Sequence, residues 1–373
     1  MKEYFINGSG GGSIACYAHS SHQEHINGIV YFAHSVTEYA ERYCDLFNML
    51  AHNGYDVIAN DHMGHGNSVN DGRKPRRPRR VWDCMCRDAK VAIEKGKEVL
   101  GRPRNTPVYA IGFSMGSYVV KAMAMKNPRL FTSVVLLGSG DMPTIKGKIL
   151  EWIMQYEIKK HGPDTMTELT KRIALESYNQ HYEIEEDDRD DCEFTDEERL
   201  RNDFEWICAN QSTVDFYIKD KMCNPVLTAG LVSELIRGMK ETGMMKNIKK
   251  INPNTSWLML SGTEDAFGGY TKDVTSFANK LSKVNIYNEV LFFDGMRHDL
   301  LHEVGSCSVN DAILRFLSAS METEDDVKIY EPNRTNKTVV NNPEIDMQVT
   351  QRISPVVAAI ADEIEAAVAK ASS

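Results

Sequence analysis

The sequence predicts an α/β protein with a mostly parallel central sheet, helices on both faces and an inserted helical cap. Short apolar runs alternate with amphipathic helical patterns between residues 28 and 137, and the same alternation resumes at residue 256. Strand–helix–strand repeats of this kind form parallel sheets with helices packed on either side. Residues 140–254 separate the two stretches and read as helices and loops, which predicts an insertion into one α/β domain.

The expected strands and helices follow in chain order. Residues 4–6 and 14–18 flank the glycine-rich sequence NGSGGG and are expected to form a hairpin. The run GIVYFA at residues 28–33 is apolar throughout, which is typical of a strand buried on both faces. Further strands are expected at residues 56–60, 107–113, 133–137, 256–260 and 289–293. Helices are expected at residues 38–53, 82–100, 115–127, 271–281 and 310–318.

These patterns divide the chain into three parts. Residues 1–139 and 255–320 are expected to form the α/β core, and residues 140–254 a helical cap rich in Met, Trp, Tyr and Phe. Residues 321–373 begin as a polar linker and end in a short helix, with Ser354 as its N-cap and Pro355 at its first position.

Composition excludes several classes of protein. The 373 residues are 42% hydrophobic and 26% charged, which suits a folded domain with a sizeable core. A formal net charge of −10 argues against a nucleic-acid binder, since phosphate binding needs concentrated Lys and Arg. No apolar run approaches the roughly 20 residues that span a bilayer. The eight cysteines, including the Cys84/Cys86 pair, lack the spacing of zinc sites. We therefore expect a reduced, cytoplasmic protein without metal or cofactor.

Two charged runs are expected to be solvated loops, because like charges repel one another and cannot be packed together. They are the basic sequence RKPRRPRR at residues 73–80 and the acidic run at residues 183–198.

A candidate nucleophile lies where an apolar strand runs into a helix. The sequence there is Gly112-Phe113-Ser114-Met115-Gly116, a G-x-S-x-G pattern in the strand–turn–helix context of a nucleophile elbow. The sharp turn exposes the serine Oγ, and the small flanking residues allow the two backbone arms to approach each other. A serine hydroxyl needs a histidine base, and the histidine needs a carboxylate that fixes its tautomer.

Two loops downstream supply those groups in the chain order Ser, Asp, His. Asp265 follows the strand SWLMLSG and is the expected acid, with its neighbour Glu264 as the alternative. His298 follows the strand NEVLFF and is the expected base. Asp294 lies only four residues before His298 and is a less natural partner for it. Loops at the carboxyl ends of strands are where parallel sheets carry their chemistry.

Acyl transfer also requires two N–H donors directed at the developing oxyanion. The backbone N–H of Met115, directly after the nucleophile, is the first expected donor. The second is expected from the loop HSVTE that follows residues 28–33, and Val36 is its candidate residue.

Several longer motifs carry a resemblance to a known family. They are HSVTEYAERY at residues 34–43, GYDVIANDHMGHGNS at 54–68, GFSMGS, GTED and GMRHDLLHE, with ESYN and FEWICANQSTVDFYIKDKMC in the insertion. Over residues 28–317 the chain resembles the monoacylglycerol lipase/lysophospholipase-like branch of the α/β-hydrolases, also labelled serine aminopeptidase S33.

The resemblance implies an α/β-hydrolase fold with a helical cap, and hydrolysis of acyl esters. By position it implies Ser114 as nucleophile, Asp265 as acid and His298 as base, with Val36 and Met115 as oxyanion donors. His62 and His65 match a loop whose role in the family is structural, and Glu38 and Arg42 match architectural positions. One departure is Ser35, where family members usually have glycine.

The expected function is that of a serine hydrolase acting on carboxylic esters of acyl chains, such as monoacylglycerols or lysophospholipids. Aromatic residues of the insertion are expected to line the acyl pocket, namely Trp152, Trp206, Phe216 and Tyr217. The same composition suggests peripheral contact with a lipid surface. A peptidase or an acyltransferase with the same triad, or a non-catalytic lipid-binding protein, remain alternatives, and the sequence leaves the oligomeric state open.

Overall fold

The computed structural model describes residues 1–68, 80–179, 182, 204–223, 227–325 and 337–339. The chain divides into two units, Met1–Val339 and Val340–Ser373, and the described residues all belong to the first of them. Most of the basic run at 73–80, the acidic run at 183–198 and the helix expected after Ser354 lie outside the described residues.

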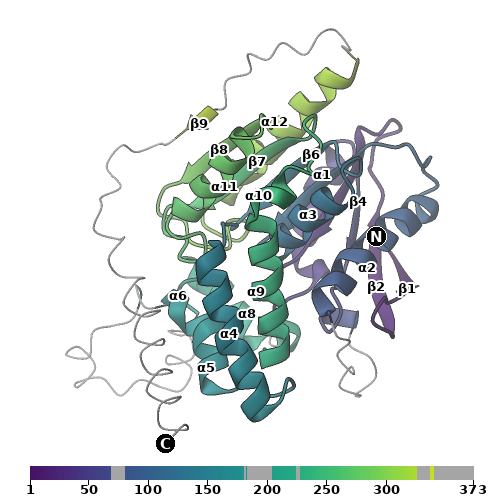
Figure 1. Cartoon of the computed structure of the whole chain (residues 1–373). Helices are drawn as coiled ribbons and strands as arrows, with labels where there is room; N and C mark the ends of the chain where they lie inside the picture. The colour runs from purple at the N-terminus through teal and green to yellow at the C-terminus, as the bar shows by residue number, and fades with distance from the viewer. Residues whose placement is uncertain (69–79, 180–181, 183–203, 224–226, 326–336, 340–373) are drawn as a thin grey trace, which may run out of the picture. The chain divides into compact units, whose positions relative to one another are not determined.

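One nine-stranded sheet organises this unit (Figure 1), in the spatial order β1-β2-β4-β3-β5-β6-β7-β8-β9. The strands β1 and β2 form the expected hairpin, and β2 pairs antiparallel with β4, whereas every other neighbouring pair is parallel. The bounds are β1 Lys2–Asn7, β2 Ser13–His19, β3 Gly28–Ala33, β4 Tyr55–Asn60, β5 Val108–Phe113, β6 Ser133–Leu137, β7 Ser256–Gly262, β8 Asn288–Phe293 and β9 Lys337–Val339. The predicted mostly parallel sheet is confirmed.

Helices cover both faces of the sheet. Side chains alternate between the faces along each strand, so Ile29 and Tyr31 of β3 pack on one side, and Val30 and Phe32 on the other. The first side carries α2 (Val81–Val99), α3 (Met115–Lys126) and α11 (Lys272–Ser282), and the second carries α1 (Cys44–His52) and α12 (Ser306–Asp325). Because both faces are covered, the central strands β3, β4 and β5 are buried at every residue.

The cap is inserted between β6 and β7. Its longest helices are α4 (Thr144–His161) and α9 (Ala229–Gly243), which pack side by side, and α9 also contacts α2 and α3 of the core (Figure 1). The shorter elements are α5 Glu168–Lys171, the π-helical turn η3 Arg172–Glu176, α6 Ser177–Asn179, α8 Gln211–Lys219, η5 Lys221–Cys223 and α10 Met245–Ile248.

Three elements differ most from expectation. The helix expected at residues 38–53 begins as the 3-10 turn η1 (Ala40–Tyr43) and becomes α-helical only at Cys44. The helix α12 extends beyond the expected residues 310–318 at both ends. The strand β9 pairs in parallel with β8 within a segment expected to be a linker. A three-residue strand is too short for its alternation of side chains to stand out in a sequence.

No helix in the described part of the chain combines the length and the apolar character that crossing a bilayer requires.

The contact between cap and core predicts different effects for two helical glycines. A Cβ on Gly238 of α9 would lie 2.2 Å from the buried ring of Trp82, whereas a Cβ on Gly147 of α4 would meet only the flexible side chain of Lys240 at 2.9 Å. Gly238→Ala should therefore lower the free energy of unfolding by about 1–3 kcal/mol. Gly147→Ala should lower it by less than Gly238→Ala, because the Lys240 side chain can shift where the Trp82 ring cannot, and because alanine favours helix by up to about 1 kcal/mol. Urea denaturation followed by Trp fluorescence measures both values, and equal values for the two variants would contradict this packing.

Candidate active site

Ser114 occupies a strained turn between β5 and α3. Its backbone has φ 51° and ψ −118°, a conformation that a residue with a side chain rarely adopts. The flanking glycine explains how the turn fits against the sheet, since a Cβ on Gly116 would lie 2.0 Å from the carbonyl oxygen of Ala33 in β3. The strand and helix thus approach closely enough to hold the serine at the carboxyl edge of the sheet, as the G-x-S-x-G pattern predicts.

Ser114, His298 and Asp265 form a continuous hydrogen-bonded chain. The Oγ of Ser114 lies 2.8 Å from Nε2 of His298, and Nδ1 of His298 lies 2.9 Å from Oδ1 of Asp265. The Asp265 oxygen also accepts backbone N–H bonds from Phe267 and Gly268. A carboxylate at Nδ1 fixes the hydrogen on that nitrogen, which leaves Nε2 free to accept the serine proton.

The two alternative acids lie elsewhere. Glu264 directs its backbone carbonyl to the Tyr182 hydroxyl, and no hydrogen bond joins its carboxylate to His298. Asp294 lies near the Thr263 hydroxyl at an exposed turn.

Aromatic side chains enclose the ring of His298. The rings of Phe113, Trp206 and Phe267 each lie with their centroids 5.0 Å from the imidazole centroid. His298 is 3% exposed and Ser114 is equally buried. The enclosure keeps bulk water from the imidazole and limits its rotation, both of which strengthen its hydrogen bonds to Ser114 and Asp265.

The loop after β3 presents backbone N–H groups beside Ser114. Thr37 has φ 64°, and the carboxylate of Glu38 accepts a 2.7 Å hydrogen bond from the N–H of Ser35, so the loop folds tightly. No acceptor is seen for the N–H of Val36 or of Met115 within the described residues. Two cavities reach Ser114, one with a polar end and one apolar. Val36 lines both of them, and Met115 lines the apolar one.

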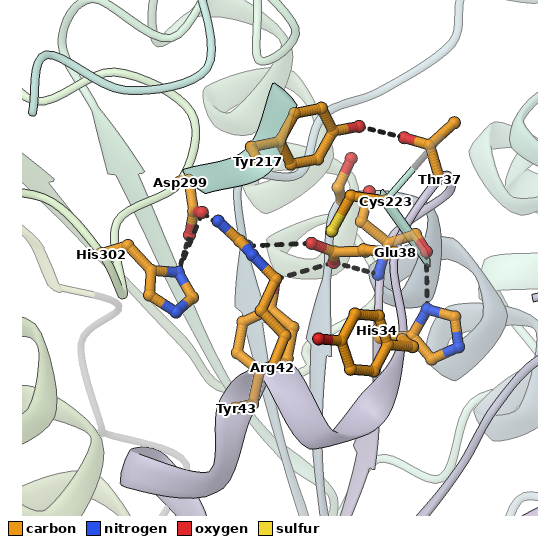
Figure 2. A network of polar contacts seen from close by, with 12 residues as sticks. His34, Thr37, Glu38, Arg42, Tyr43, Tyr217, Cys223, Asp299 and His302 are labelled. Carbon is orange, nitrogen blue, oxygen red and sulfur yellow. Dashed lines mark hydrogen bonds and ion pairs between the residues drawn. The ribbon is translucent and has the colours of Figure 1, made fainter. Parts of the chain in front are cut away.

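A buried charged network supports this loop (Figure 2). Nη1 of Arg42 donates to Glu38 at 3.0 Å and to Asp299 at 2.9 Å, and Asp299 also accepts from Nδ1 of His302. Burial opposes the ionisation of Asp299, but the charges of His302 and Arg42 outweigh it and hold the pKa of Asp299 well below its usual range. Burial raises the pKa of Glu38, and Arg42 partly offsets that rise. Because Asp299 directly follows His298, the network ties the loop after β3 to the loop that bears His298.

The three histidines of the family motifs lie together beneath the loop. Nε2 of His34 accepts from the backbone N–H of His62, and the rings of His34 and His62 lie 4.3 Å apart. His65 lies against them with its ring centroid 5.5 Å from that of His34. Burial lowers the pKa of His62 to about 3 and holds the pKa of His34 well below its usual range, so these two imidazoles are uncharged at neutral pH.

Two cavities meet at Ser114. The first has a polar end, lined by the network residues Glu38, Arg42 and Asp299 together with Thr37, Tyr217 and His298, while its other walls are mostly apolar and include Leu175, Trp206 and Ile207. The second is apolar and runs between the core and the cap, with Leu150 of α4 on one wall. Val36, Ser114 and Phe267 border both. A substrate with one polar and one apolar arm therefore fits with its reacting bond at Ser114.

The expected pocket residues divide into two pairs. Trp206 and Tyr217 line the cavity with the polar end and do not line the apolar cavity. Tyr217 is also hydrogen-bonded to Thr37. The prediction is wrong for Trp152 and Phe216, which are 53% and 57% exposed on the outer faces of α4 and α8. Aromatic composition does not reveal which face of a cap helix turns inward, and these two helices turn other residues toward the core.

Some lining residues were not singled out from the sequence. The inner face of α9 supplies four residues of the apolar wall, Val232, Leu235, Ile236 and Met239. Their i, i+3, i+4, i+7 spacing is a helical stripe that the sequence does contain. Arg42, assigned an architectural position, also lines the polar cavity, and its Nε and Nη2 have no hydrogen-bond partner among the described residues.

A segment of the cap is fastened to the histidine loop, and we call these contacts the cap–loop clasp (residues 205–209 with residues 297–303). Oε1 of Glu303 accepts from the N–H groups of Ala209 and Arg297, both at 2.9 Å. The N–H of Asp299 donates to the carbonyl of Ile207 at 2.7 Å. The loop that bears His298 is therefore bonded to the cap as well as to the core.

Arg297 extends the clasp toward the loop that bears Asp265. Its Nη1 donates to Oε2 of Glu205 at 2.6 Å, and its guanidinium lies 4.2 Å from the ring centroid of Tyr182. The hydroxyl of Tyr182 in turn donates to the carbonyl of Glu264 at 2.6 Å, directly before Asp265. Cap residues thus hold the segments on either side of the His298–Asp265 pair.

Comparison with known proteins agrees with this fold. The sequence model of the family described as "Serine aminopeptidase, S33" matches residues 9–305. A "Monoglyceride lipase homolog" of Monkeypox virus is 23% identical over 276 residues, which cover 74% of this chain and 83% of that protein.

Two solved structures illustrate the structural likeness. The carboxyl esterase of Bacillus coagulans, in complex with glycerol, superposes with a TM-score of 0.71 at 17% identity, covering 86% of this chain and 98% of that chain. A soluble variant of monoglyceride lipase from Saccharomyces cerevisiae, in complex with a substrate analog, gives a TM-score of 0.61 at 16% identity, over 86% and 94% of the two chains. The fold is that of an α/β-hydrolase. The chain belongs to the serine aminopeptidase S33 family, whose sequence model spans most of its length.

The clasp predicts a local effect on backbone protection. Arg297→Gln removes the charged bond to Glu205, which is worth about 1.5–3 kcal/mol, and should speed amide hydrogen exchange in residues 205–209 and 297–303 by about 10- to 100-fold. Hydrogen-exchange mass spectrometry measures this. Arg237→Gln is the matched control, because Arg237 is equally half-buried and bonds Glu234, Asp83 and Glu241 between α9 and α2. Unchanged protection of both segments in Arg297→Gln would show that the clasp contributes nothing.

Proposed function

We propose that this protein is a serine hydrolase that cleaves carboxylic esters of acyl chains through an acyl-enzyme. The observation that carries the proposal is the hydrogen-bonded chain Ser114–His298–Asp265 at the junction of a polar and an apolar cavity. Membership of a hydrolase family agrees with it.

The chemistry follows from the positions of the three side chains. Nε2 of His298 takes the proton of Ser114 as Oγ attacks the ester carbonyl carbon, and Asp265 stabilises the imidazolium that forms. The N–H groups of Val36 and Met115 donate to the carbonyl oxygen as it gains negative charge. His298 then protonates the alcohol oxygen as the C–O bond breaks, leaving the acyl group on Ser114. A water deprotonated by His298 attacks this acyl group and regenerates the serine.

The two cavities suggest how the substrate is oriented. The apolar wall of α9 suits an acyl chain, because burying methylene groups there is favourable by about 0.8 kcal/mol each. The polar cavity suits the alcohol part, since Nε and Nη2 of Arg42 are donors without a partner among the described residues. We propose a monoacylglycerol or a lysophospholipid-like ester as the substrate, a choice that the names of the Monkeypox virus and yeast relatives support. Because long-chain esters reside in lipid surfaces, the proposal includes peripheral contact with such a surface.

The charges of the polar cavity disfavour peptidase activity on free amino termini. Recognition of an α-ammonium group calls for a carboxylate without another cationic partner. The two carboxylates that line the cavity, Glu38 and Asp299, are both bonded to Arg42, and Asp299 also to His302. A cationic substrate end would have to displace a buried arginine.

Labelling with a fluorophosphonate probe tests the nucleophile. Wild type should be labelled, Ser114→Ala should not, and the control Ser212→Ala should be labelled like wild type, since Ser212 is an exposed serine on α8. Ser114→Ala should also reduce hydrolysis of p-nitrophenyl esters by at least about 10³-fold. Absence of labelling in folded wild type would overturn the proposal and favour a non-catalytic lipid-binding protein.

A second variant tests the acyl cavity. Leu235→Trp places a larger side chain on the α9 wall of the apolar cavity. The p-nitrophenyl ester chain length with the highest kcat/KM should become shorter, while hydrolysis of the acetyl ester should be retained. An unchanged chain-length profile in this variant would show that the acyl chain binds elsewhere.

A further inference from the structure

The loop that follows β6 adjoins all three residues of the hydrogen-bonded chain, and we call residues 138–141 the β6 loop. Gly138 lies against the imidazole, because a Cβ on it would be 3.0 Å from both Nδ1 and Cε1 of His298. The backbone N–H of Ser114 donates to the carbonyl of Leu137, directly before the loop, at 2.9 Å. The start of the β6 loop is therefore fitted between the nucleophile and the base.

Ser139 continues these contacts to the nucleophile and to the acid. Its hydroxyl lies 2.7 Å from the hydroxyl of Ser117, which in turn lies 2.5 Å from the carbonyl oxygen of Ser114. Its carbonyl oxygen packs against Gly268, where a Cβ would be 3.0 Å from that oxygen and 3.1 Å from Oδ2 of Asp265. The N–H of Gly268 also donates to Oδ1 of Asp265. A shift of Ser139 would therefore displace the segment that holds the carboxylate.

A buried lysine holds the β6 loop from the helix of the nucleophile. Lys121 lies in α3 and is 1% exposed, and its Nζ donates to the carbonyl of Gly140 at 2.6 Å. The same nitrogen lies 4.2 Å from the ring centroid of Tyr118 and 4.0 Å from that of Phe277 in α11. Aromatic faces attract cations, so the two rings and the carbonyl together fix the end of the side chain.

The stability of α3 does not account for a lysine at this position. Burial lowers the pKa of Lys121 to about 7, although the charges of Asp141 and Asp273 oppose that fall. The charge of Lys280 adds to it. An apolar side chain of similar size would be buried at a lower cost, because a buried ammonium group loses its hydration. The contribution that an apolar residue could not make is the bond to Gly140.

We propose that Lys121 is a positioning residue for the reaction proposed above and that it acts through the β6 loop. Because α3 begins directly after Ser114, the bond from Lys121 to Gly140 fixes the helix of the nucleophile relative to the loop that adjoins the base and the acid. Asp141 bonds to Lys280 at 2.5 Å, but this bond leads to α11, which does not carry the nucleophile. The inference rests on the proposed function, since it assigns a role within that reaction.

The position of Lys121 predicts an effect on turnover and not on binding. Neither Lys121 nor any residue of the β6 loop lines the apolar cavity or the cavity with the polar end. A change at Lys121 should therefore disturb the mutual geometry of the reacting groups and leave the substrate contacts intact.

Steady-state kinetics of Lys121→Met with p-nitrophenyl butyrate tests the inference. Methionine keeps an unbranched apolar chain but has no N–H donor. The kcat should fall about 10- to 100-fold, because a misplacement of about 1 Å costs up to that much, while KM should change by less than about twofold. The control is Lys97→Met in α2, where a half-buried lysine likewise donates to the carbonyls of Arg104 and Thr106. This control should keep the kcat of wild type.

A double-mutant cycle tests whether Lys121 acts through the loop. Ser139→Ala removes the hydroxyl beside Ser117. It should lower kcat by about 3- to 10-fold in wild type but by less than about twofold in Lys121→Met, because the loop is then already displaced. Full additivity of the two losses would overturn the inference, since Lys121 would then act independently of the loop.

Proton NMR of the hydrogen between Nδ1 of His298 and Asp265 gives a readout that does not depend on turnover. Its resonance, which lies downfield of the backbone amides, should shift in Lys121→Met and stay unchanged in Lys97→Met. If Lys121→Met does not fold, Lys121→Gln replaces it in every measurement, because its uncharged amide nitrogen stops one bond short of the Nζ position.

The outcomes separate this inference from the proposed function. Unchanged kcat in the folded Lys121 variant, an equal loss in Lys97→Met, or a higher KM with unchanged kcat would each overturn it. If wild type hydrolyses no ester, the proposed function fails. The NMR comparison still decides in that case, because an unshifted His298 resonance in the Lys121 variant would show that Lys121 does not position the base.

Discussion

The close approach of the Ser114 turn to the end of β3 is the constraint on which the rest of the site depends. Ser114 keeps a backbone conformation that costs of order 1–3 kcal/mol, and it keeps it because β5 and α3 are both anchored in the core. The same approach leaves no room for a side chain at Gly116, beside Ala33. It sets the N–H of Met115 next to the loop of Val36. One steric fact thereby determines where the hydroxyl points and which backbone donors surround it.

The cap contributes to this arrangement as well as covering it. Glu303 and Arg297 bond the histidine loop to cap residues, and Trp206 of the cap lies against the ring of His298. The other part of the cap, α4 with α9, borders the apolar cavity and contacts the core through side-chain packing and through the ion pair of Arg237 with Asp83 of α2. Both parts of the cap are therefore bonded to the core as well as packed against it.

The sequence predicted the core well and the cap poorly, for physical reasons. Strands such as GIVYFA are buried on both faces, and their composition alone identifies them. The G-x-S-x-G pattern and the loops of Asp265 and His298 follow those strands directly. Predicting the strands therefore also predicted where these residues lie in the fold. A cap helix can carry apolar residues on more than one face, so its sequence does not show which face turns toward the core. Only tertiary contacts decide which face that is. Trp152 was expected inside for that reason and lies outside, while the Leu235 stripe of α9 lines the cavity. Arg42 belongs to an ion network and also borders a cavity. This position depends on its bond to Asp299, which lies 257 residues later in the chain.

A crystal structure of the protein after reaction with a long-chain alkyl phosphonate would test the central claim most directly. The account predicts a covalent bond from phosphorus to Oγ of Ser114. It also predicts a phosphonyl oxygen within hydrogen-bond distance of the N–H groups of Val36 and Met115, and an alkyl chain along α9 in the apolar cavity. A phosphonyl oxygen turned away from both N–H groups, or an adduct on another residue, would contradict the account, because the strained turn at Ser114 would then have no part in binding the reacting centre.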